Sequence, residues 1–313
     1  MSRPRLTVPT EEDAARFADL DADVDVWDFR TPAPGGAPID LALRPYLAGD
    51  LRHLDGERVR AVQAQSLGYD DAVGRVPDGV VWCNAVGVHE GPTAEIAVGL
   101  LIAGRRGFAQ AARAVPDERR REGRRRWGIG PSRPGVLGSR ILLLGHGGIG
   151  REIATRLDGF GAELVIVAHT AREEDGRTVH GADELAGLLP TVDAVVVAVP
   201  YGPATHHLLD DAFLSALPDG ALVVNVARGK VADTDALVDH ARRGRIELAL
   251  DVVDPEPLPD DHPLWTLPNV LLTPHVGGDV STRMDRVDPL FRAQVARLRA
   301  GEPLACQVDV SPR

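Results

Sequence analysis

The sequence has few of the residues that mark extracellular, metal-binding or membrane-spanning proteins. Cys83 and Cys306 are its only cysteines, so no disulfide framework is indicated, and neither has a partner at the spacing of zinc ligands. No apolar run approaches the ~20 residues that cross a bilayer. Residues 1–8 lack the long apolar core of a secretory signal. These absences predict a cytoplasmic enzyme that uses no metal site.

Lysine is also scarce, and acidic residues outnumber basic ones. Lys230 is the only lysine, and the formal net charge of −11 argues against a general nucleic-acid binder and against attachment to anionic membranes. The exception is segment 113–133, which holds eight arginines against three acids. Such a run forms either a phosphate or nucleic-acid patch or a solvated helix and loop. We favour the solvated segment, because Trp127 is its only aromatic residue and the whole chain is acidic.

Strand and helix patterns alternate along the 313 residues, which are enough for two domains. The first part predicts a helix over 11–20 capped by Thr10, and strands at 5–8, 24–27, 59–65 and 80–83. The second part predicts six strands, at 141–144, 164–168, 194–199, 221–226, 246–252 and 270–273. Helices are expected at 93–108, 183–189, 210–217, 233–242 and 283–300. Most of the six strands are too apolar to be half exposed, which predicts a doubly wound parallel sheet.

A glycine-rich turn follows the first of these six strands. Ile141–Leu144 is an apolar run typical of a strand buried on both faces, and a helical pattern continues to Leu157. Glycines at this spacing allow a tight turn, close approach of the backbone to a pyrophosphate, and close packing of helix on strand. The amino terminus of the helix offers unpaired N–H groups to the phosphates. The stretch predicts a dinucleotide site made of Gly145, His146, Gly147, Gly148, Ile149 and Gly150.

Four polar side chains follow the carboxyl ends of later strands, where ligands bind in such sheets. Each has an ordinary alternative: Arg228 as a surface charge, Asp251 as a turn cap, Glu256 as an exposed loop acid and His275 as a satisfied loop histidine. Their occurrence at successive ends of one sheet favours an active site.

Three of these side chains fit one reaction, the transfer of a hydride between a nicotinamide and C2 of a 2-oxo acid. The planar guanidinium of Arg228 can hold the substrate carboxylate and polarise the carbonyl. His275 can act as a proton donor that titrates near neutrality, and Glu256 can orient its ring.

Several stretches together resemble the D-isomer-specific 2-hydroxyacid dehydrogenase family over nearly the whole chain. They are 66–68, 93–95, 145–150, 200–209, 223–229, 251–258 and 273–278. The resemblance implies a Rossmann nucleotide domain over 90–276, inserted in a smaller flavodoxin-like substrate domain made of 1–89 and 277–313. It also implies a homodimer built largely on the region 93–108.

The resemblance further implies roles for single residues. Ser66, Leu67 and Gly68 would form the substrate loop, whose backbone N–H groups hold the carboxylate that Arg228 also binds. Asp251 would hold the nicotinamide carboxamide. Further contacts to the cofactor would come from Pro200, Thr205, Val226, Ala227, His275 and Gly277.

The sequence departs from the family pattern where the cofactor ribose binds. An acid about 20 residues after the glycines normally holds the 2′-OH of NAD, but the end of the next strand, residues 167–172, has no carboxylate before Glu173. Thr170 and Arg172, helped by His169, could instead bind a 2′-phosphate, so we predict a preference for NADP(H), with NAD also possible. The alternative is a loop that brings Glu173 back to the ribose.

Other functions remain open at this point. The family's corepressor branch suggests a non-enzymatic dinucleotide sensor, and another oxidoreductase on this fold, acting on phosphite or formate, is a weaker option. His206 and His207 invite a metal interpretation, which we reject because adjacent side chains point to different faces. The basic residue nearest 66–70 is Arg75, so substrates similar to glyoxylate or hydroxypyruvate are favoured over phosphorylated acids.

Overall fold

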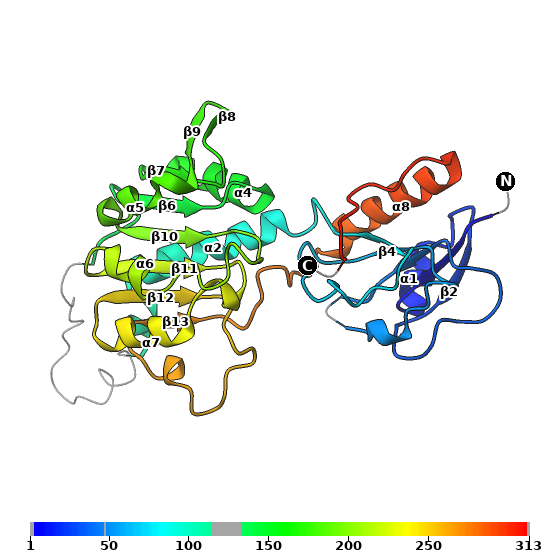
Figure 1. Ribbon diagram of the computed structural model, residues 1–313, viewed down its shortest axis with the longest axis horizontal. Coiled ribbons are helices and arrows are strands. Elements are labelled where there is room, and N and C mark those ends of the chain that lie inside the picture. The colour runs from blue at the N-terminus through cyan, green and yellow to red at the C-terminus, as the bar shows by residue number, and fades with distance from the viewer. Residues whose placement is uncertain (1–2, 47, 114–132, 312–313) are drawn as a thin grey trace, which may run out of the picture. The chain divides into compact units, whose positions relative to one another are not determined.

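The computed structural model describes residues 3–46, 48–113 and 133–311 and divides the chain into two compact units (Figure 1). Unit 1 is Met1–His89 with Val280–Arg313, and unit 2 is Glu90–Asp279. The predicted first boundary coincides with this division, whereas residues 277–279 fall in unit 2 instead of unit 1. Among the described helices none is long and apolar enough to span a membrane. Most of the arginine-rich segment, 114–132, lies outside the described residues.

Unit 1 contains a five-stranded parallel sheet in the order β2-β1-β3-β4-β5, the order of flavodoxin-like folds. Its elements are β1 (Arg5–Val8), α1 (Glu11–Arg16), β2 (Asp23–Val26), β3 (Leu41–Leu43), the 3-10 turn η1 (Leu51–His53), β4 (Ala61–Gln63), β5 (Val81–Cys83) and α8 (Met284–Ala300). Thr10 caps α1 as predicted, accepting a hydrogen bond from the Asp13 N–H. The short strand β3 was not among the predicted strands.

The C-terminal part of the chain packs onto this sheet. Phe291 of α8 is buried with Phe17, and their ring centroids lie 4.9 Å apart. A polar contact reinforces the packing, since the buried Gln294 amide donates to Gln63 Oε1 at 2.8 Å and to the Ala305 carbonyl at 2.8 Å. These contacts explain why residues distant in sequence from β1–β5 belong to unit 1.

Unit 2 contains an eight-stranded sheet in the order β13-β12-β11-β10-β6-β7-β9-β8, in which β8 alone pairs antiparallel. Its strands are β6 (Arg140–Leu144), β7 (Glu163–Val167), β8 (Arg172–Glu174), β9 (Arg177–His180), β10 (Ala194–Val197), β11 (Ala221–Asn225), β12 (Ile246–Leu250) and β13 (Val270–Leu272). Its helices are α2 (Glu90–Arg106), α4 (Gly148–Leu157), α5 (Leu185–Leu188), α6 (Asp211–Ala216) and α7 (Thr234–Arg242). The 3-10 turns are η2 (Asp158–Phe160), η3 (Ala182–Glu184), η4 (Leu189–Thr191), η5 (Gly229–Val231) and η6 (Pro263–Trp265).

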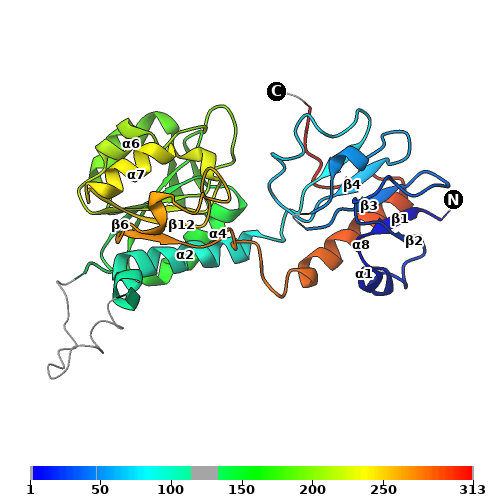
Figure 2. The same ribbon diagram turned by 90° about the horizontal axis from the view of Figure 1, so that it is seen from below.

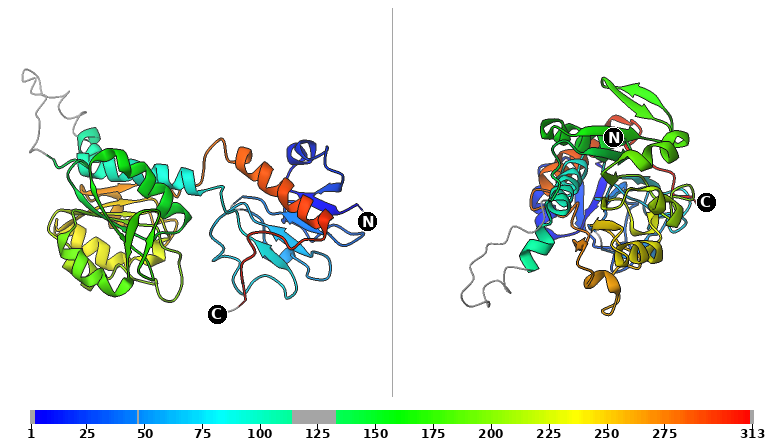
Figure 3. Two further views of the ribbon diagram at one scale, coloured as in Figure 1. Left: turned by 90° about the horizontal axis from the view of Figure 1, so that it is seen from above. Right: turned by 90° about the vertical axis from the view of Figure 1, so that its left-hand side faces the viewer.

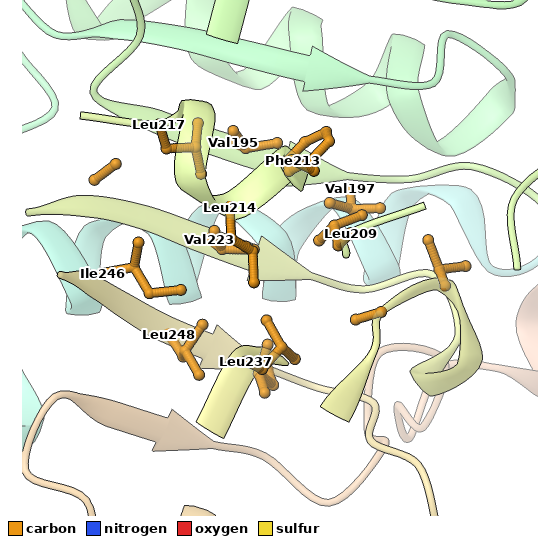
Figure 4. Close-up of a cluster of buried hydrophobic side chains, with 14 of the residues drawn as sticks. Val195, Val197, Leu209, Phe213, Leu214, Leu217, Val223, Leu237, Ile246 and Leu248 are labelled. Carbon is orange, nitrogen blue, oxygen red and sulfur yellow. The ribbon is translucent and has the colours of Figure 1, made fainter. Parts of the chain in front are cut away.

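Helices cover both faces of this sheet, with α6 and α7 on one face and α2 and α4 on the other (Figure 2). Successive strand residues alternate between the two cores, so Leu142 packs on the α6 and α7 side and Leu143 on the α2 and α4 side. Figure 4 shows side chains of β10, β11 and β12 meeting those of α6 and α7. The predicted doubly wound parallel sheet is therefore confirmed.

The hairpin of β8 and β9 was not predicted, since residues 169–173 were interpreted as a loop. β9 pairs with β7 in the sheet, and the turn of the hairpin projects from unit 2 (Figure 1 and Figure 3). β8 has the sequence Arg-Glu-Glu, and charged residues on an edge strand hide the alternation that reveals a strand. The signal was present at Asp175 and Gly176, which both have positive φ (53° and 74°) as a two-residue Asp-Gly hairpin turn requires.

Removing part of a core side chain tests the packing of unit 2. Leu143 is 0% exposed in the core that α2 and α4 share with the sheet. We expect Leu143→Ala to lower the free energy of unfolding of unit 2 by about 2–5 kcal/mol, through lost burial and a residual cavity. Leu137→Ala, at a side chain 78% exposed, should change it by less than ~0.5 kcal/mol. Equal effects in chemical denaturation would contradict this core.

Candidate active site

The glycine turn lies between β6 and α4. Gly145 has φ +106°, and a Cβ there would lie 2.5 Å from the Ala198 carbonyl oxygen. A Cβ at Gly150 would lie 2.1 Å from the Gly145 carbonyl oxygen. Gly147 differs, because a Cβ there would meet nothing within 4 Å. The backbone at Gly147, at the amino terminus of α4, can thus be approached by a pyrophosphate, so these residues fit a dinucleotide.

The residues predicted to hold the ribose follow β7. His169 and Thr170 are exposed, and Arg172 begins β8. The Arg172 guanidinium donates to Oε2 of Glu174 from Nε at 2.9 Å and from Nη2 at 2.7 Å. Glu173 turns away and accepts a hydrogen bond from Thr178 Oγ1 at 2.7 Å. The acid that contacts Arg172 and the glycine turn is therefore Glu174, which the sequence did not reveal.

Arg228 follows β11 in a turn that Asn225 closes. The buried Asn225 side chain accepts a hydrogen bond from the Ala227 N–H at 3.0 Å and donates to the Arg228 carbonyl at 3.0 Å. A Cβ at Gly229 would lie 1.9 Å from the Val253 carbonyl oxygen. The turn that carries Arg228 is thus packed directly on the segment that leads from β12 to Glu256.

His275 and Glu256 form a direct pair. His275 Nδ1 lies 2.7 Å from Glu256 Oε1, and both side chains are partly exposed, at 35% and 41%. His275 has φ +54°, which a residue other than glycine rarely adopts. The structure therefore brings together the predicted proton donor and its carboxylate.

Asp251 holds the segment around His275 in this conformation. It is 2% exposed, and its Oδ1 accepts hydrogen bonds from Thr273 Oγ1 at 2.6 Å and from the Val276 N–H at 3.0 Å. Its Oδ2 accepts from the Gly277 N–H at 2.9 Å. The His275 N–H donates to the Asp251 carbonyl at 2.8 Å. This positioning of the loop is a role that sequence reasoning missed, and it stands beside the predicted contact to a carboxamide.

The strand order explains why these segments share one region. β11, β12 and β13 are neighbours and run parallel, so their carboxyl ends lie at one edge of the sheet. Arg228, Asp251 and His275 follow these three ends in that order. Val226 and Ala227, predicted to contact the cofactor, lie at the same edge and are buried.

The segment after β10 forms a closed turn. Thr205 Oγ1 donates to the Pro200 carbonyl at 2.7 Å and accepts from the Gly202 N–H at 2.9 Å. His206 and His207 stack on each other with centroids 3.9 Å apart. Within the described ranges, no group of three or more His, Cys, Asp or Glu side chains could hold a metal ion.

The predicted substrate loop follows β4 in unit 1. Its carbonyl oxygens are bonded, since Ala85 N–H donates to the Ser66 carbonyl at 2.9 Å and Asn84 Nδ2 to the Leu67 carbonyl at 3.0 Å. Ser66 Oγ donates to the Gly68 carbonyl at 2.8 Å. In the part of the chain that the structure describes, no acceptor takes the N–H groups of Leu67 and Gly68. The loop can therefore offer two backbone donors to an anion.

Known proteins are similar to this chain in sequence and fold. Residues 98–277 match D-isomer specific 2-hydroxyacid dehydrogenase, NAD binding domain. Glyoxylate reductase of Pyrococcus horikoshii is 35% identical over 253 residues, which cover 78% of this chain and 75% of that protein. Glyoxylate reductase/hydroxypyruvate reductase of Homo sapiens is 28% identical over 97% of this chain and 96% of its own length. The crystal structure of a D-isomer specific 2-hydroxyacid dehydrogenase from Xanthobacter autotrophicus, in complex with NADPH and MES, has a TM-score of 0.82 and 27% identity, covering 99% of both chains.

The match to the NAD-binding domain covers more than half of the chain and contains the glycine turn, Arg228, Glu256 and His275. The fold, with a Rossmann sheet and a second parallel sheet, agrees with it. The chain belongs to the D-isomer specific 2-hydroxyacid dehydrogenase family and is an oxidoreductase that transfers a hydride between a nicotinamide dinucleotide and C2 of a 2-oxo acid or D-2-hydroxy acid.

Proposed function

We propose that this enzyme reduces a small 2-oxo acid similar to glyoxylate or hydroxypyruvate, that it prefers NADP(H), and that it acts as a homodimer. The contact of 2.7 Å between His275 and Glu256 carries the proposal, because it pairs a proton donor with a carboxylate at the sheet edge that Arg228 also follows. Relatives named glyoxylate reductase and glyoxylate reductase/hydroxypyruvate reductase support the substrate class. They also make a purely dinucleotide-sensing role less favoured.

The nicotinamide supplies the hydride when it is bound, and the chain supplies the proton. Because Glu256 takes the Nδ1 side of the His275 ring, the Nε2–H faces away from it and is the proton that passes to the substrate oxygen. Glu256 fixes the orientation of the His275 ring through its contact with Nδ1. The loop anchored on Asp251 keeps that ring in place.

Arg228 and the substrate loop bind the acid in this proposal. The Arg228 guanidinium would hold the carboxylate and polarise the C2 carbonyl, so that negative charge developing on the oxygen is stabilised. The N–H groups of Leu67 and Gly68 would bind the same carboxylate as backbone donors. Neither interaction requires the substrate to carry a bulky or charged group in addition to its 2-oxo acid.

Two further features support the cofactor and the assembly. Arg151 and Arg172 lie beside the glycine turn and provide the guanidinium groups that a 2′-phosphate needs, and the relative from Xanthobacter autotrophicus holds NADPH. For the homodimer we point to the segment 93–108, whose end exposes 55% of Phe108, a large apolar side chain.

Loss of Arg228 or His275 should remove catalysis while dinucleotide binding survives. We expect Arg228→Ala and His275→Ala to lower kcat by about 10²–10⁴-fold, since each removes a group that acts on the reacting carbonyl. Steady-state kinetics with glyoxylate and calorimetric titration with the dinucleotide measure the two quantities separately. Arg243→Ala and His53→Ala, outside the proposed site, serve as matched controls. Near-normal turnover in either site variant would exclude that residue from the mechanism.

Cofactor preference can be read from the unmodified enzyme. We expect kcat/KM for NADPH to exceed that for NADH, because two guanidinium groups lie beside the glycine turn. Absorbance at the nicotinamide wavelength with a panel of 2-oxo acids measures both cofactor and substrate preference. A clear advantage for NADH would refute this part of the proposal.

Asp251→Asn tests whether the hydrogen bonds of Asp251 hold the loop that carries His275. An amide cannot accept hydrogen bonds with both of its terminal atoms, so either the part-buried N–H of Val276 or the buried N–H of Gly277 loses its partner. We expect a loss of about 1–3 kcal/mol in the free energy of unfolding of unit 2, together with a lower kcat. Asp260→Asn, at an exposed loop residue, is the control. An unchanged unfolding curve would show that the loop does not depend on Asp251.

A further inference from the structure

Glu174 is the centre of a cluster of cationic and polar donors. Its Oε2 accepts from His146 Nδ1 at 2.9 Å and from Arg172 at 2.9 and 2.7 Å. Its Oε1 accepts from Nε of Arg151 at 3.2 Å and also from Nη2 of that guanidinium. These hydrogen bonds, from Arg151 first, then Arg172 and His146, lower the pKa of Glu174 to about 2, so it is an anion at any physiological pH.

Each donor belongs to the dinucleotide-binding part of unit 2. His146 lies inside the glycine turn and is 4% exposed, and Arg151 follows in the first turns of α4. Arg172 comes shortly after β7 and also donates to the His146 carbonyl at 3.3 Å. In Rossmann sheets the side chain after the second strand reaches the 2′ position of the cofactor ribose. Glu174 therefore holds Arg151 and Arg172 close to the place where the 2′ group of the cofactor ribose would bind.

The negative charge of Glu174 makes the cluster more favourable for a ribose 2′-OH than for a 2′-phosphate. A 2′-phosphate carries about −1.5 to −2 charges at neutral pH and needs guanidinium donors, which here are already bonded to a carboxylate. To use them, the phosphate must displace Glu174 or lie beside a like charge, which disfavours binding. A ribose 2′-OH has no charge, so it meets no such repulsion from the Glu174 carboxylate.

We propose that Glu174 determines cofactor selectivity by occupying the arginine pair that a 2′-phosphate uses, so that it restrains the preference for NADP(H). This inference rests on the proposed function for the identity of the arginine pair. It adds that the Glu174 carboxylate makes the preference for NADP(H) over NAD(H) smaller than the two arginines alone would give. Removing the charge of Glu174 frees Arg151 and Arg172 for the phosphate and removes the like charge that repels it.

Binding of two adenosine nucleotides tests this without turnover. Adenosine 2′,5′-bisphosphate and 5′-AMP differ only in the 2′-phosphate, and calorimetry gives Kd for each. We expect Glu174→Gln to lower the Kd of the bisphosphate at least about tenfold and to change that of 5′-AMP much less, because one like charge has been removed. Arg172→Gln should raise the Kd of the bisphosphate about tenfold through loss of a charge-assisted hydrogen bond.

The hairpin offers a matched control, the ion pair between Arg177 and Asp158, which does not involve Glu174. Arg177→Gln should leave the ratio of the two Kd values unchanged. A ratio that is unchanged or shifted toward 5′-AMP in Glu174→Gln would overturn the inference and make Glu174 a residue that positions the arginines. In the unmodified protein, the ratio of the two Kd values tests the proposed preference for NADP(H), and the reduction of 2-oxo acids tests the proposed reaction. Either of these can fail while the ratio still changes in Glu174→Gln, so the two proposals are tested separately.

Discussion

The parallel direction of neighbouring strands is the constraint on which the proposed site depends. β11 and most of β12 are buried among apolar side chains, and β13 pairs with β12 in parallel register, so the segments after the three strands leave the sheet at one edge. The chain needs no long loop to collect a guanidinium, an imidazole and two carboxylates there. The core on both faces fixes the strands, and the hydrogen bonds of Asn225 and Asp251 then fix the turns that carry Arg228 and His275.

Much of the fold was predictable because buried parallel strands are almost purely apolar and glycine has a distinct conformational range. Runs such as Ile141–Leu144 and Ala194–Val197 predicted their strands, and the spacing of Gly145, Gly147 and Gly150 predicted the turn before α4. The residues expected to act on the substrate could be named because the strand ends are visible in the sequence. The contact between Glu256 and His275 depends on the fold, because the two residues are 19 positions apart in the sequence.

The remainder depends on contacts that no local pattern encodes. The hairpin of β8 and β9 was hidden by charged residues, and it is this hairpin that carries Glu174 back to His146, 28 positions earlier. The bonds from Asp251 to Val276 and Gly277 likewise join separate loops. The union of 280–313 with the first unit rests on buried packing of α8, which the family resemblance implied but the hydrophobic pattern of the chain could not show.

The central claim, stereospecific hydride transfer between the nicotinamide and C2 of a 2-oxo acid, has a direct test in isotope transfer. The substrate would be pyruvate or hydroxypyruvate, whose reduction gives a product that is chiral at C2. The NADPH would carry deuterium at the transferable C4 position, and the product would be analysed by chiral chromatography and mass spectrometry. The account predicts one deuterium at C2 of the D-2-hydroxy acid. A product without deuterium at C2, or of the L configuration, would contradict it.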